Sequence, residues 1–227
     1  MHIKSEPEIL YFGTPVVLIS TCNEDSSYNI APVSSVFWLG WRCVIGISAA
    51  SKTTENILRN KSCVLNLPSV NEVDAVNRLA LTTGSDPVPE GKKRKGYMHV
   101  RNKFTIASLT PQISETVSAP RIMECPVQME ACLENVTSLA ANNLELNGKT
   151  LVIEFRILRV YLDDSILIDG SKNRVDPDKW KPLIMSFQKF YSLCDQVHSS
   201  KLSSIPEYLY HSSDMDKAGN LNPAFSL

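Results

Sequence analysis

The alternation of apolar and polar residues in the first seventy positions predicts short strands separated by tight turns. Residues 16–21 are rich in β-branched side chains, residues 23–27 are polar, and residues 43–49 are again apolar. Short apolar runs bounded by turn residues are typical of buried strands. We therefore expect three or four antiparallel strands over residues 14–49, and a further strand over residues 62–67.

Between these strands the pattern changes to that of a helix. Ser51, Thr53 and Thr54 are favoured N-cap residues, and the apolar Ile57 and Leu58 follow them. This order predicts a helix that begins within residues 51–54.

A second helix is expected a few residues later. Ser69 and Glu72 have the spacing of a capping box ahead of the apolar residues Val73 and Val76. Gly84 is suited to the C-terminal end of this helix.

The second half of the chain contains two longer strand candidates, residues 122–133 and 151–162. The Asn-rich residues 140–149 between them predict a hairpin loop. Asp176 followed by Pro177 predicts the first turn of a short helix. The pattern as a whole indicates a mainly β, antiparallel barrel with a few helices.

The segment Ser51-Lys52-Thr53-Thr54 has the features of an anion site. A strand that leads into a helix N-terminus leaves backbone N–H groups at the positive end of the helix dipole, where a phosphate is favoured. Lys52 adds a full charge, and three hydroxyls add donors. An ordinary capped helix without a ligand fits the same residues.

The segment before it, residues 29–35, has the features of a place where a flat ring could approach. Pro32 has no N–H group, so regular strand pairing is interrupted near it. Ala31, Ser34 and Ser35 are small. A proline at the edge of a sheet is also common in proteins that bind no ligand.

Taken together, these segments resemble the flavin reductase-like, FMN-binding split-barrel family, in particular its flavoredoxin group. The resemblance covers roughly residues 10–182 and rests on motifs in a fixed order: Asn29-Ile30-Ala31-Pro32-Val33-Ser34-Ser35, Ser51-Lys52-Thr53-Thr54-Glu55-Asn56, Cys63-Val64-Leu65-Asn66-Leu67-Pro68, Val73-Asp74-Ala75-Val76, Arg78-Leu79-Ala80, Gly96-Tyr97-Met98-His99-Val100-Arg101-Asn102-Lys103-Phe104, Leu109-Thr110-Pro111, Ala119-Pro120-Arg121 and Glu124-Cys125-Pro126-Val127. It implies a split β-barrel, antiparallel and Greek-key-like, over residues 1–183. Residues 184–227 would be a C-terminal extension, partly disordered or packed on the surface.

The resemblance also implies which residues bind FMN. It assigns a first group to the phosphate: Ser51, Lys52, Thr53, Thr54 and Asn56. It assigns a second group to the ribityl chain and the ring: Asn29, Ala31, Pro32, Val33, Ser34 and Ser35. Ser48 would lie between the two groups, and His99 and Lys103 would lie close to the pocket.

The implied reaction is hydride transfer from NAD(P)H to FMN, which requires no acidic, basic or nucleophilic side chain. We therefore predict no catalytic residue, and the four dispersed histidines predict no metal site. Two alternatives remain open: an FMN electron carrier that a partner protein reduces, and a binding module that has lost its flavin.

Two aromatic residues bear on assembly. Trp38 and Trp41 flank Gly40 at a predicted hairpin, where they could line the flavin pocket, pack in the core or meet a second subunit. The family resemblance implies a homodimer.

Residues 85–96 are expected to form a loop that contains the basic run Lys92-Lys93-Arg94-Lys95. Gly91 and Gly96 have P-loop spacing, but Tyr97 stands where that motif needs lysine, which excludes nucleotide hydrolysis of that type. The basic run could be a solvated loop or a docking site for the phosphates of a pyridine nucleotide. Near the C-terminus, Phe190 and Tyr191 are candidates to cover the flavin.

Composition limits the remaining possibilities. The net charge of −1 gives no field that would attract nucleic acid or an anionic membrane. The six cysteines include no Cys-x-x-Cys pair, the four histidines are dispersed, and the N-terminus has no signal-peptide core. We expect a cytoplasmic protein.

Overall fold

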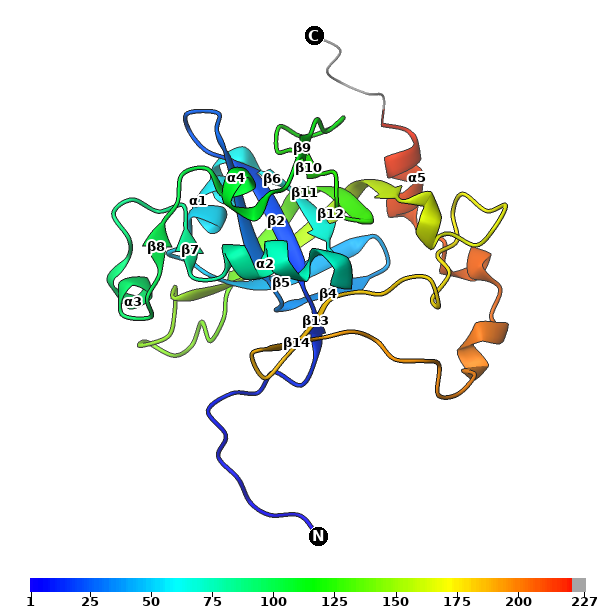
Figure 1. Ribbon diagram of the computed structural model, residues 1–227, viewed down its shortest axis with the longest axis horizontal. Coiled ribbons are helices and arrows are strands. Elements are labelled where there is room, and N and C mark those ends of the chain that lie inside the picture. The colour runs from blue at the N-terminus through cyan, green and yellow to red at the C-terminus, as the bar shows by residue number, and fades with distance from the viewer. Residues whose placement is uncertain (222–227) are drawn as a thin grey trace.

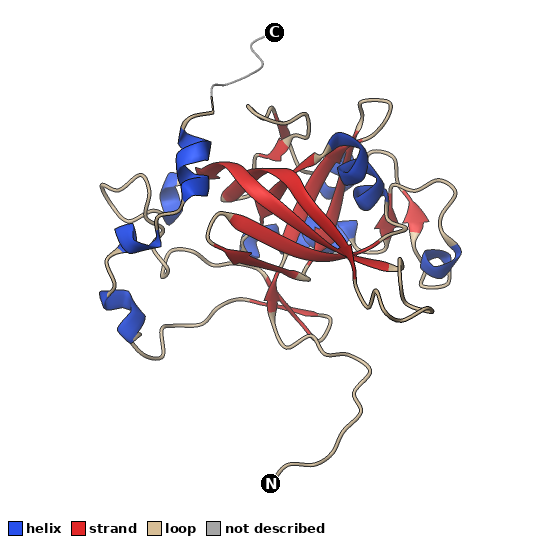
Figure 2. Cartoon of the chain, turned by 180° about the vertical axis from the view of Figure 1, so that it is seen from behind, coloured by secondary structure: helices blue, strands red, loops and turns tan. Residues whose placement is uncertain are grey.

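A seven-stranded antiparallel sheet forms the centre of the computed structural model, which describes residues 1–221 (Figures 1 and 2). In spatial order its strands are β3 (Tyr28–Val33), β2 (Val17–Cys22), β6 (Ser62–Leu67), β11 (Val127–Ser138), β12 (Thr150–Leu162), β5 (Arg42–Ser48) and β4 (Val36–Leu39). Hairpins join β2 to β3, β4 to β5 and β11 to β12. The fold is a mainly β split barrel, as the sequence predicted.

Successive side chains of β2 point to opposite faces of the sheet, so the strand contributes to two hydrophobic cores, one on each face. Val17 and Ile19 face the larger core, which the strands of the sheet enclose. Leu18 faces a second core beneath the helices α2 (Val73–Leu79) and α4 (Lys103–Ala107). Both helices lie in front of the sheet in Figure 1.

The strand predictions hold over residues 14–67. Between residues 14 and 49, β2, β3, β4 and β5 are four strands of the main sheet, and β6 matches the strand expected over residues 62–67. The prediction of one strand over residues 122–133 is wrong. The Cys125 N–H donates to the Ile122 carbonyl at 3.1 Å, and Pro126 has no N–H group. A turn therefore separates the short β10 (Arg121–Ile122), which pairs with β9 (Pro111–Gln112), from β11.

Both predicted helix starts are confirmed. Ser51 caps α1 (Lys52–Asn60), and Ser69 and Glu72 form a capping box at the short 3-10 helix η1 (Val70–Glu72), which leads into α2. However, α2 ends at Leu79 and does not reach Gly84.

The early end of α2 has a local cause. Ala80 is extended, and Leu81 has a φ of +55°, outside the helical region. The chain then forms β7 (Thr82–Thr83), which pairs in parallel with β8 (Met98–His99).

Two further local predictions are wrong. Residues 85–96 contain the short helix α3 (Glu90–Lys93) and are not entirely a loop. Asp176 does cap one turn, since its carboxylate accepts from the Asp178 N–H at 2.9 Å and its carbonyl accepts from the Trp180 N–H at 2.9 Å, but this turn does not continue into a helix. The predicted loop over residues 140–149 is confirmed.

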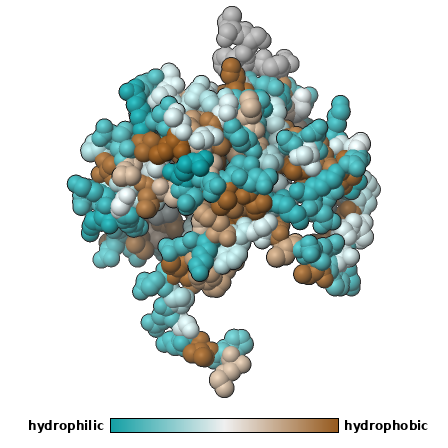
Figure 3. All heavy atoms as spheres, viewed as in Figure 1, coloured by the Kyte–Doolittle hydropathy of each residue, from teal (hydrophilic) through white to brown (hydrophobic). Residues whose placement is uncertain are grey.

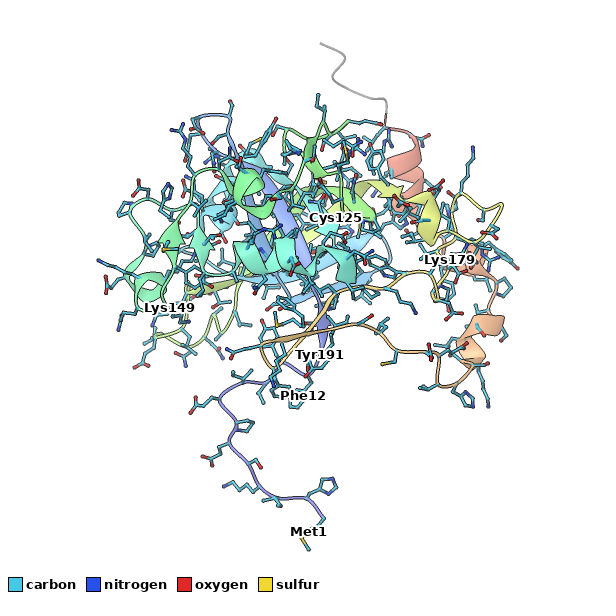
Figure 4. All side chains as sticks on the ribbon, in the orientation of Figure 1. Met1, Phe12, Cys125, Lys149, Lys179 and Tyr191 are labelled. Carbon is cyan, nitrogen blue, oxygen red and sulfur yellow. The ribbon has the colours of Figure 1, made fainter. Side chains whose placement is uncertain are left out.

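A small three-stranded sheet joins the chain near its N-terminus to residues 184–191. Its strands are β1 (Thr14–Pro15), β13 (Ile184–Ser186) and β14 (Lys189–Tyr191). The Phe12 and Phe187 rings meet edge to face at 4.9 Å, and Figure 4 places Phe12 and Tyr191 at the same end of the molecule. The domain division at residue 183 stays a prediction, and β13 begins directly after it.

The C-terminal segment returns to the main sheet, where α5 (Ser213–Gly219) lies against β12. Arg42 Nε donates to Asp214 Oδ2 at 2.7 Å, and Arg159 donates to the Ala218 carbonyl. The other short helices are η2 (Asp164–Ile166), η3 (Lys201–Ser204) and η4 (Glu207–Tyr210). The last six residues of the predicted extension, 222–227, lie outside the described residues.

The two tryptophans of the β4–β5 hairpin pack against the larger core. Gly40, with a φ of +57°, makes the turn between them. Of the three roles considered for Trp38 and Trp41, the structure favours core packing.

Figure 3 shows hydrophobic and hydrophilic residues mixed over the visible face, with the N-terminal arm projecting away from the body. Over residues 1–221, every helix is too short or too polar to cross a membrane.

Candidate functional site

A cavity of about 330 Å³ opens beside the N-terminus of α1. Its walls come from β3, the end of β5, the start of α1, the chain around β7 and the lysines of α3 and α4. The lining residues are Tyr11, Asn29, Ala31, Pro32, Val33, Ser34, Ser35, Gly46, Ile47, Ser48, Ser51, Lys52, Thr53, Leu79, Ala80, Leu81, Thr82, Thr83, Gly84, Lys92, Tyr97 and Lys103. Eleven of the fourteen residues that the sequence suggested for FMN line this one cavity.

One end of the cavity, which we call the α1 end, is formed by Ser51, Lys52 and Thr53. Ser51 Oγ accepts from the Thr54 N–H at 3.0 Å and so caps the helix. The N–H groups of Lys52 and Thr53 belong to the first helical turn, which has no intrahelical acceptor. The α1 end therefore offers two backbone donors at the positive end of the helix dipole.

The charge of Lys52 is balanced by two carboxylates. Its Nζ lies 2.9 Å from Glu24 Oε2 and 2.8 Å from Glu55 Oε1. Desolvation acts to lower the pKa of Lys52, but the hydrogen bonds with Glu55 and Glu24 outweigh it and hold the pKa above its usual value. Lys52 is thus a cation whose local charge is already neutralised.

The side chain of Asn29 lies between α1 and the residues directly after β7, and it contacts both. Its Nδ2 donates to Thr53 Oγ1 at 3.1 Å, while its buried Oδ1 has no hydrogen-bond partner among residues 1–221. A Cβ at Gly84 would lie 2.6 Å from this oxygen and 3.2 Å from Lys52 Cγ. Only glycine at position 84 lets the chain approach Asn29 this closely.

The long wall of the cavity consists of small residues at the end of β3 and the connection to β4. Because β3 is an edge strand of the seven-stranded sheet, Pro32 is tolerated there without the loss of a central hydrogen bond. Ala31, Ser34 and Ser35 leave room for a flat group. The Gly46 N–H donates to the Ser35 carbonyl at 2.8 Å, and a Cβ at Gly46 would lie 3.5 Å from Ser35 Cβ, so Gly46 extends the same wall.

Tyr11 reaches the cavity from the N-terminal arm, and its hydroxyl forms a hydrogen bond with Ser35 Oγ. The arm is held in place because the Phe187 N–H donates to the Tyr11 carbonyl at 2.9 Å. Phe190 and Tyr191 do not line the cavity; Phe190 packs against the second core and Tyr191 is exposed. The aromatic residue beside the long wall is therefore Tyr11.

The other end of the cavity, which we call the lysine end, is formed by Thr83, Lys92, Tyr97 and Lys103. Lys92 Nζ donates to Thr83 Oγ1 at 3.2 Å and lies 5.7 Å from the centre of the Tyr97 ring. Lys103 Nζ donates to the Ile30 carbonyl at 2.9 Å. Neither lysine forms an ion pair within the described part of the chain.

Burial has a large effect on Lys103, whose side chain is only 2% exposed. It lowers the pKa of Lys103 to about 7, and the nearby charge of Lys92 acts in the same direction. Burial also lowers the pKa of Lys92. The two ends of the cavity thus hold lysines in opposite electrostatic situations.

Three of the suggested residues lie elsewhere. Thr54 Oγ1 donates to the Ser48 carbonyl at 2.8 Å and so ties α1 to the end of β5. Asn56 Nδ2 donates to Asn23 Oδ1 at 2.8 Å and so ties α1 to the chain after β2. His99 is exposed, and its Nδ1 lies 3.2 Å from the Ser85 carbonyl. It lines a neighbouring cavity of about 340 Å³ that shares Lys52 and Gly84 with the first.

Sequence reasoning missed the segment 79–84 and the residues Tyr11, Gly46 and Ile47. The positive φ of Leu81 turns this segment toward the cavity, and no residue type in it signals that turn. Lys92 could have been found, because it belongs to the basic run that was considered for phosphate binding.

Comparisons with known proteins agree with this architecture. Residues 9–193 match the model of the flavin reductase like domain family. The uncharacterized protein YdfE of Bacillus subtilis (strain 168) is 35% identical over 192 residues, which cover 85% of this chain and 89% of YdfE.

Two solved structures show the same fold at lower identity. Flavoredoxin of Desulfovibrio vulgaris (Miyazaki F) superposes with a TM-score of 0.71 at 20% identity and covers 88% of this chain and 98% of its own. A protein with a split barrel domain from Shewanella frigidimarina NCIMB 400 superposes with a TM-score of 0.63 at 20% identity. The match covers 83% of this chain and 86% of that protein. The chain belongs to the flavin reductase-like family of flavin-related, split-barrel oxidoreductases.

Proposed function

We propose that this protein is an NAD(P)H-dependent FMN reductase, with FMN bound in the cavity beside α1. The observation that carries the proposal is the pairing of a capped helix N-terminus with a wall of small residues in one cavity. A flavin nucleotide needs both a phosphate site and a narrow, smooth surface for its ring.

The residues fit such an occupant. The N–H groups of Lys52 and Thr53, with the hydroxyl of Thr53, are donors for the phosphate. Along the wall, the segment from Ala31 to Ser35 leaves a narrow space, and the unpaired Oδ1 of Asn29 is an acceptor for a ribityl hydroxyl or a ring N–H. When bound, FMN supplies the hydride-accepting chemistry.

The contribution of the chain is to bind, to orient and to exclude water. Proximity of two stacked rings can supply a large share of the barrier reduction in hydride transfer. The carboxylates closest to the α1 end, Glu24 and Glu55, are engaged with Lys52. We therefore assign no acid or base role to a side chain.

The experiment that tests the proposal is a spectroscopic titration of the purified protein. We expect the protein to bind FMN, and we expect the bound flavin to lose its yellow colour when NADH or NADPH is added without oxygen. If FMN binds but neither nucleotide reduces it, the reductase proposal is wrong and a protein partner must supply the electrons. If no flavin binds, a flavin-free binding module is the better interpretation.

An FMN electron carrier is the second candidate. One observation favours it. The Tyr11 hydroxyl bonds to Ser35 Oγ beside the long wall, so the Tyr11 side chain narrows the space through which a nicotinamide ring would approach. Replacement of Tyr11 by alanine separates the two candidates. In a reductase whose access Tyr11 limits, reduction by NAD(P)H should become faster, whereas in a carrier it should stay negligible.

The proposal includes assembly as a homodimer in the cytoplasm. Several large apolar side chains of the terminal segments are exposed in the single chain: Leu10, Phe12, Phe187 and Tyr191. Exposed apolar clusters are commonly covered at a two-fold interface. Sedimentation of the FMN-loaded protein at micromolar concentration tests this, and a stable, FMN-loaded monomer would contradict it.

A further inference from the structure

We infer that Lys93, Arg94 and Lys95, which we call the rim cations, bind the 2′-phosphate of NADPH and make the protein prefer NADPH to NADH. The inference rests on the proposed function, because it concerns the hydride donor of that reaction. It gives a role to the part of the basic run that does not line the cavity.

The basic run leaves the cavity wall and returns to it. Lys92 and Tyr97 line the cavity, whereas the rim cations between them are exposed. The segment folds back on itself, since the Gly96 N–H donates to the Lys93 carbonyl at 3.0 Å and the Tyr97 N–H donates to the Lys92 carbonyl at 3.1 Å. The rim cations therefore lie at the mouth of the cavity and not on a remote face.

The charges of the rim cations are poorly neutralised. Arg94 Nε lies 3.9 Å from Glu90 Oε1, and both of these side chains are largely exposed. Over residues 1–221, Lys93 and Lys95 form no ion pair. Residues 90–97 contain four cations and one carboxylate, in a chain whose net charge is −1. The mouth of the cavity thus carries a local positive charge that would attract an anionic ligand.

A pyridine nucleotide would bring phosphate groups to this mouth. The cavity of about 330 Å³ lies at the small end of the range for a single ligand of moderate size, so with a flavin inside only the nicotinamide ring has room to enter. The phosphates and the adenosine then remain outside. NADH and NADPH differ there by one group, the 2′-phosphate, which as a monoester carries about −1.5 to −2 charges at pH 7.

The expected preference is moderate because the rim cations are solvated. One exposed ion pair strengthens binding by at most about fivefold. Together the rim cations should favour NADPH over NADH by about tenfold or more in kcat/KM. The preference should weaken as salt is added, since the screening length falls from about 30 Å at 0.01 M to about 8 Å at 0.15 M.

The first test compares the reduction of the FMN-loaded protein by NADPH and by NADH. The double variant Lys93→Gln with Lys95→Gln removes two rim cations. The matched control, Lys172→Gln with Lys201→Gln, removes the same charge from exposed side chains elsewhere. Figure 1 shows the orange segment around residue 201 on the side of the molecule opposite α3.

We expect the ratio of kcat/KM for NADPH to that for NADH to fall by about four- to twentyfold in the rim variant and to stay at the parent value in the control. The kinetics with NADH should be alike in all three proteins. An equal loss with both nucleotides in the rim variant would mean that these cations bind the shared pyrophosphate, which would overturn the inference.

The second test measures binding without hydride transfer. Adenosine 2′,5′-bisphosphate carries the distinguishing phosphate, and 5′-AMP lacks it. Calorimetry should show that the parent and the control bind the bisphosphate more tightly, and that the rim variant loses this preference.

The second test also separates the inference from the proposed function. If neither nucleotide reduces the flavin, the proposed function fails, but the two adenosine phosphates still test the rim cations. The inference is overturned if the parent does not distinguish the bisphosphate from 5′-AMP, or if the rim variant keeps the preference of the parent.

Discussion

The two ends of the cavity each present lysine, yet the lysines are in opposite situations. At the α1 end, Lys52 is held by Glu24 and Glu55, and the helix N-terminus supplies additional donors that carry no formal charge. At the lysine end, Lys92 and Lys103 bond only to neutral oxygens. Counting lysines is therefore not enough to predict the net charge around a ligand. That charge depends on whether each lysine is paired with a carboxylate.

The largest effect is expected where the space between the two ends is filled. Ser35→Trp places an indole against Gly46 and Tyr11, where only small side chains fit. We expect FMN affinity to fall by more than about a hundredfold, which corresponds to roughly 3 kcal/mol. Fluorescence titration measures this. Ser203→Trp, on the distant η3, is the control and should bind FMN like the parent.

The next prediction concerns the pH dependence of the folding stability of the flavin-free protein, which reports on the lysine end alone. Lys103 has a pKa of about 7 in the folded chain, below its usual value of 10.5, so between these values the unfolded chain binds more protons than the folded one. Folding stability should therefore rise with pH, by about 1.4 kcal/mol for each unit between pH 7 and 8.5.

Urea unfolding at several pH values checks this stability slope. We expect the slope to disappear in Lys103→Met and to persist in Lys93→Met. A parent slope no steeper than that of Lys103→Met would show that the buried ammonium is not the source.

A smaller effect should appear when the charge balance of the α1 end is altered. Glu24→Gln removes one of the two carboxylates that neutralise Lys52, while the backbone donors of α1 remain. We expect FMN to bind only a few-fold more tightly, by at most about fivefold, because ion pairs between exposed side chains are weak. Asp25→Asn, whose partner is the exposed Arg101, is the control. Weaker FMN binding in Glu24→Gln would mean that Glu24 positions Lys52 and does not compete for it.

The smallest effect is expected at His99, which lies outside the cavity and bonds to the Ser85 carbonyl. His99→Ala should retain FMN and keep flavin reduction within about tenfold of the parent, or ~1.4 kcal/mol of barrier. Stopped-flow reduction by NADH and NADPH measures this. A loss of a thousandfold or more with FMN still bound would reveal an acid–base role.

The sequence predicts the α1 end well because its signals are local. Ser51 caps α1 through a bond to the N–H three residues later, and Pro32 marks the edge strand β3. These features depend on neighbouring residues, so residue type and spacing are sufficient to find them. The small residues that follow Pro32 were placed correctly for the same reason.

The lysine end is harder to predict because tertiary contacts build it. Nothing near Lys103 in the sequence shows that its ammonium will be buried against the Ile30 carbonyl, 73 positions away. The wall at residues 79–84 depends on the positive φ of Leu81, a conformation that leucine rarely adopts. Tyr11 enters the site only because β1 pairs with β13, at the other end of the chain.

The central claim is that a flavin nucleotide lies in this cavity with its phosphate at the N-terminus of α1. The most direct test is the ratio of FMN to riboflavin affinity in the parent and in Lys52→Ala, measured at pH 7 by fluorescence titration. We expect the parent to prefer FMN by at least about tenfold. We expect Lys52→Ala to lose most of that preference, because it removes the cation that balances the carboxylates of Glu24 and Glu55 beside the phosphate. Equal affinity of the parent for FMN and riboflavin would contradict the assignment.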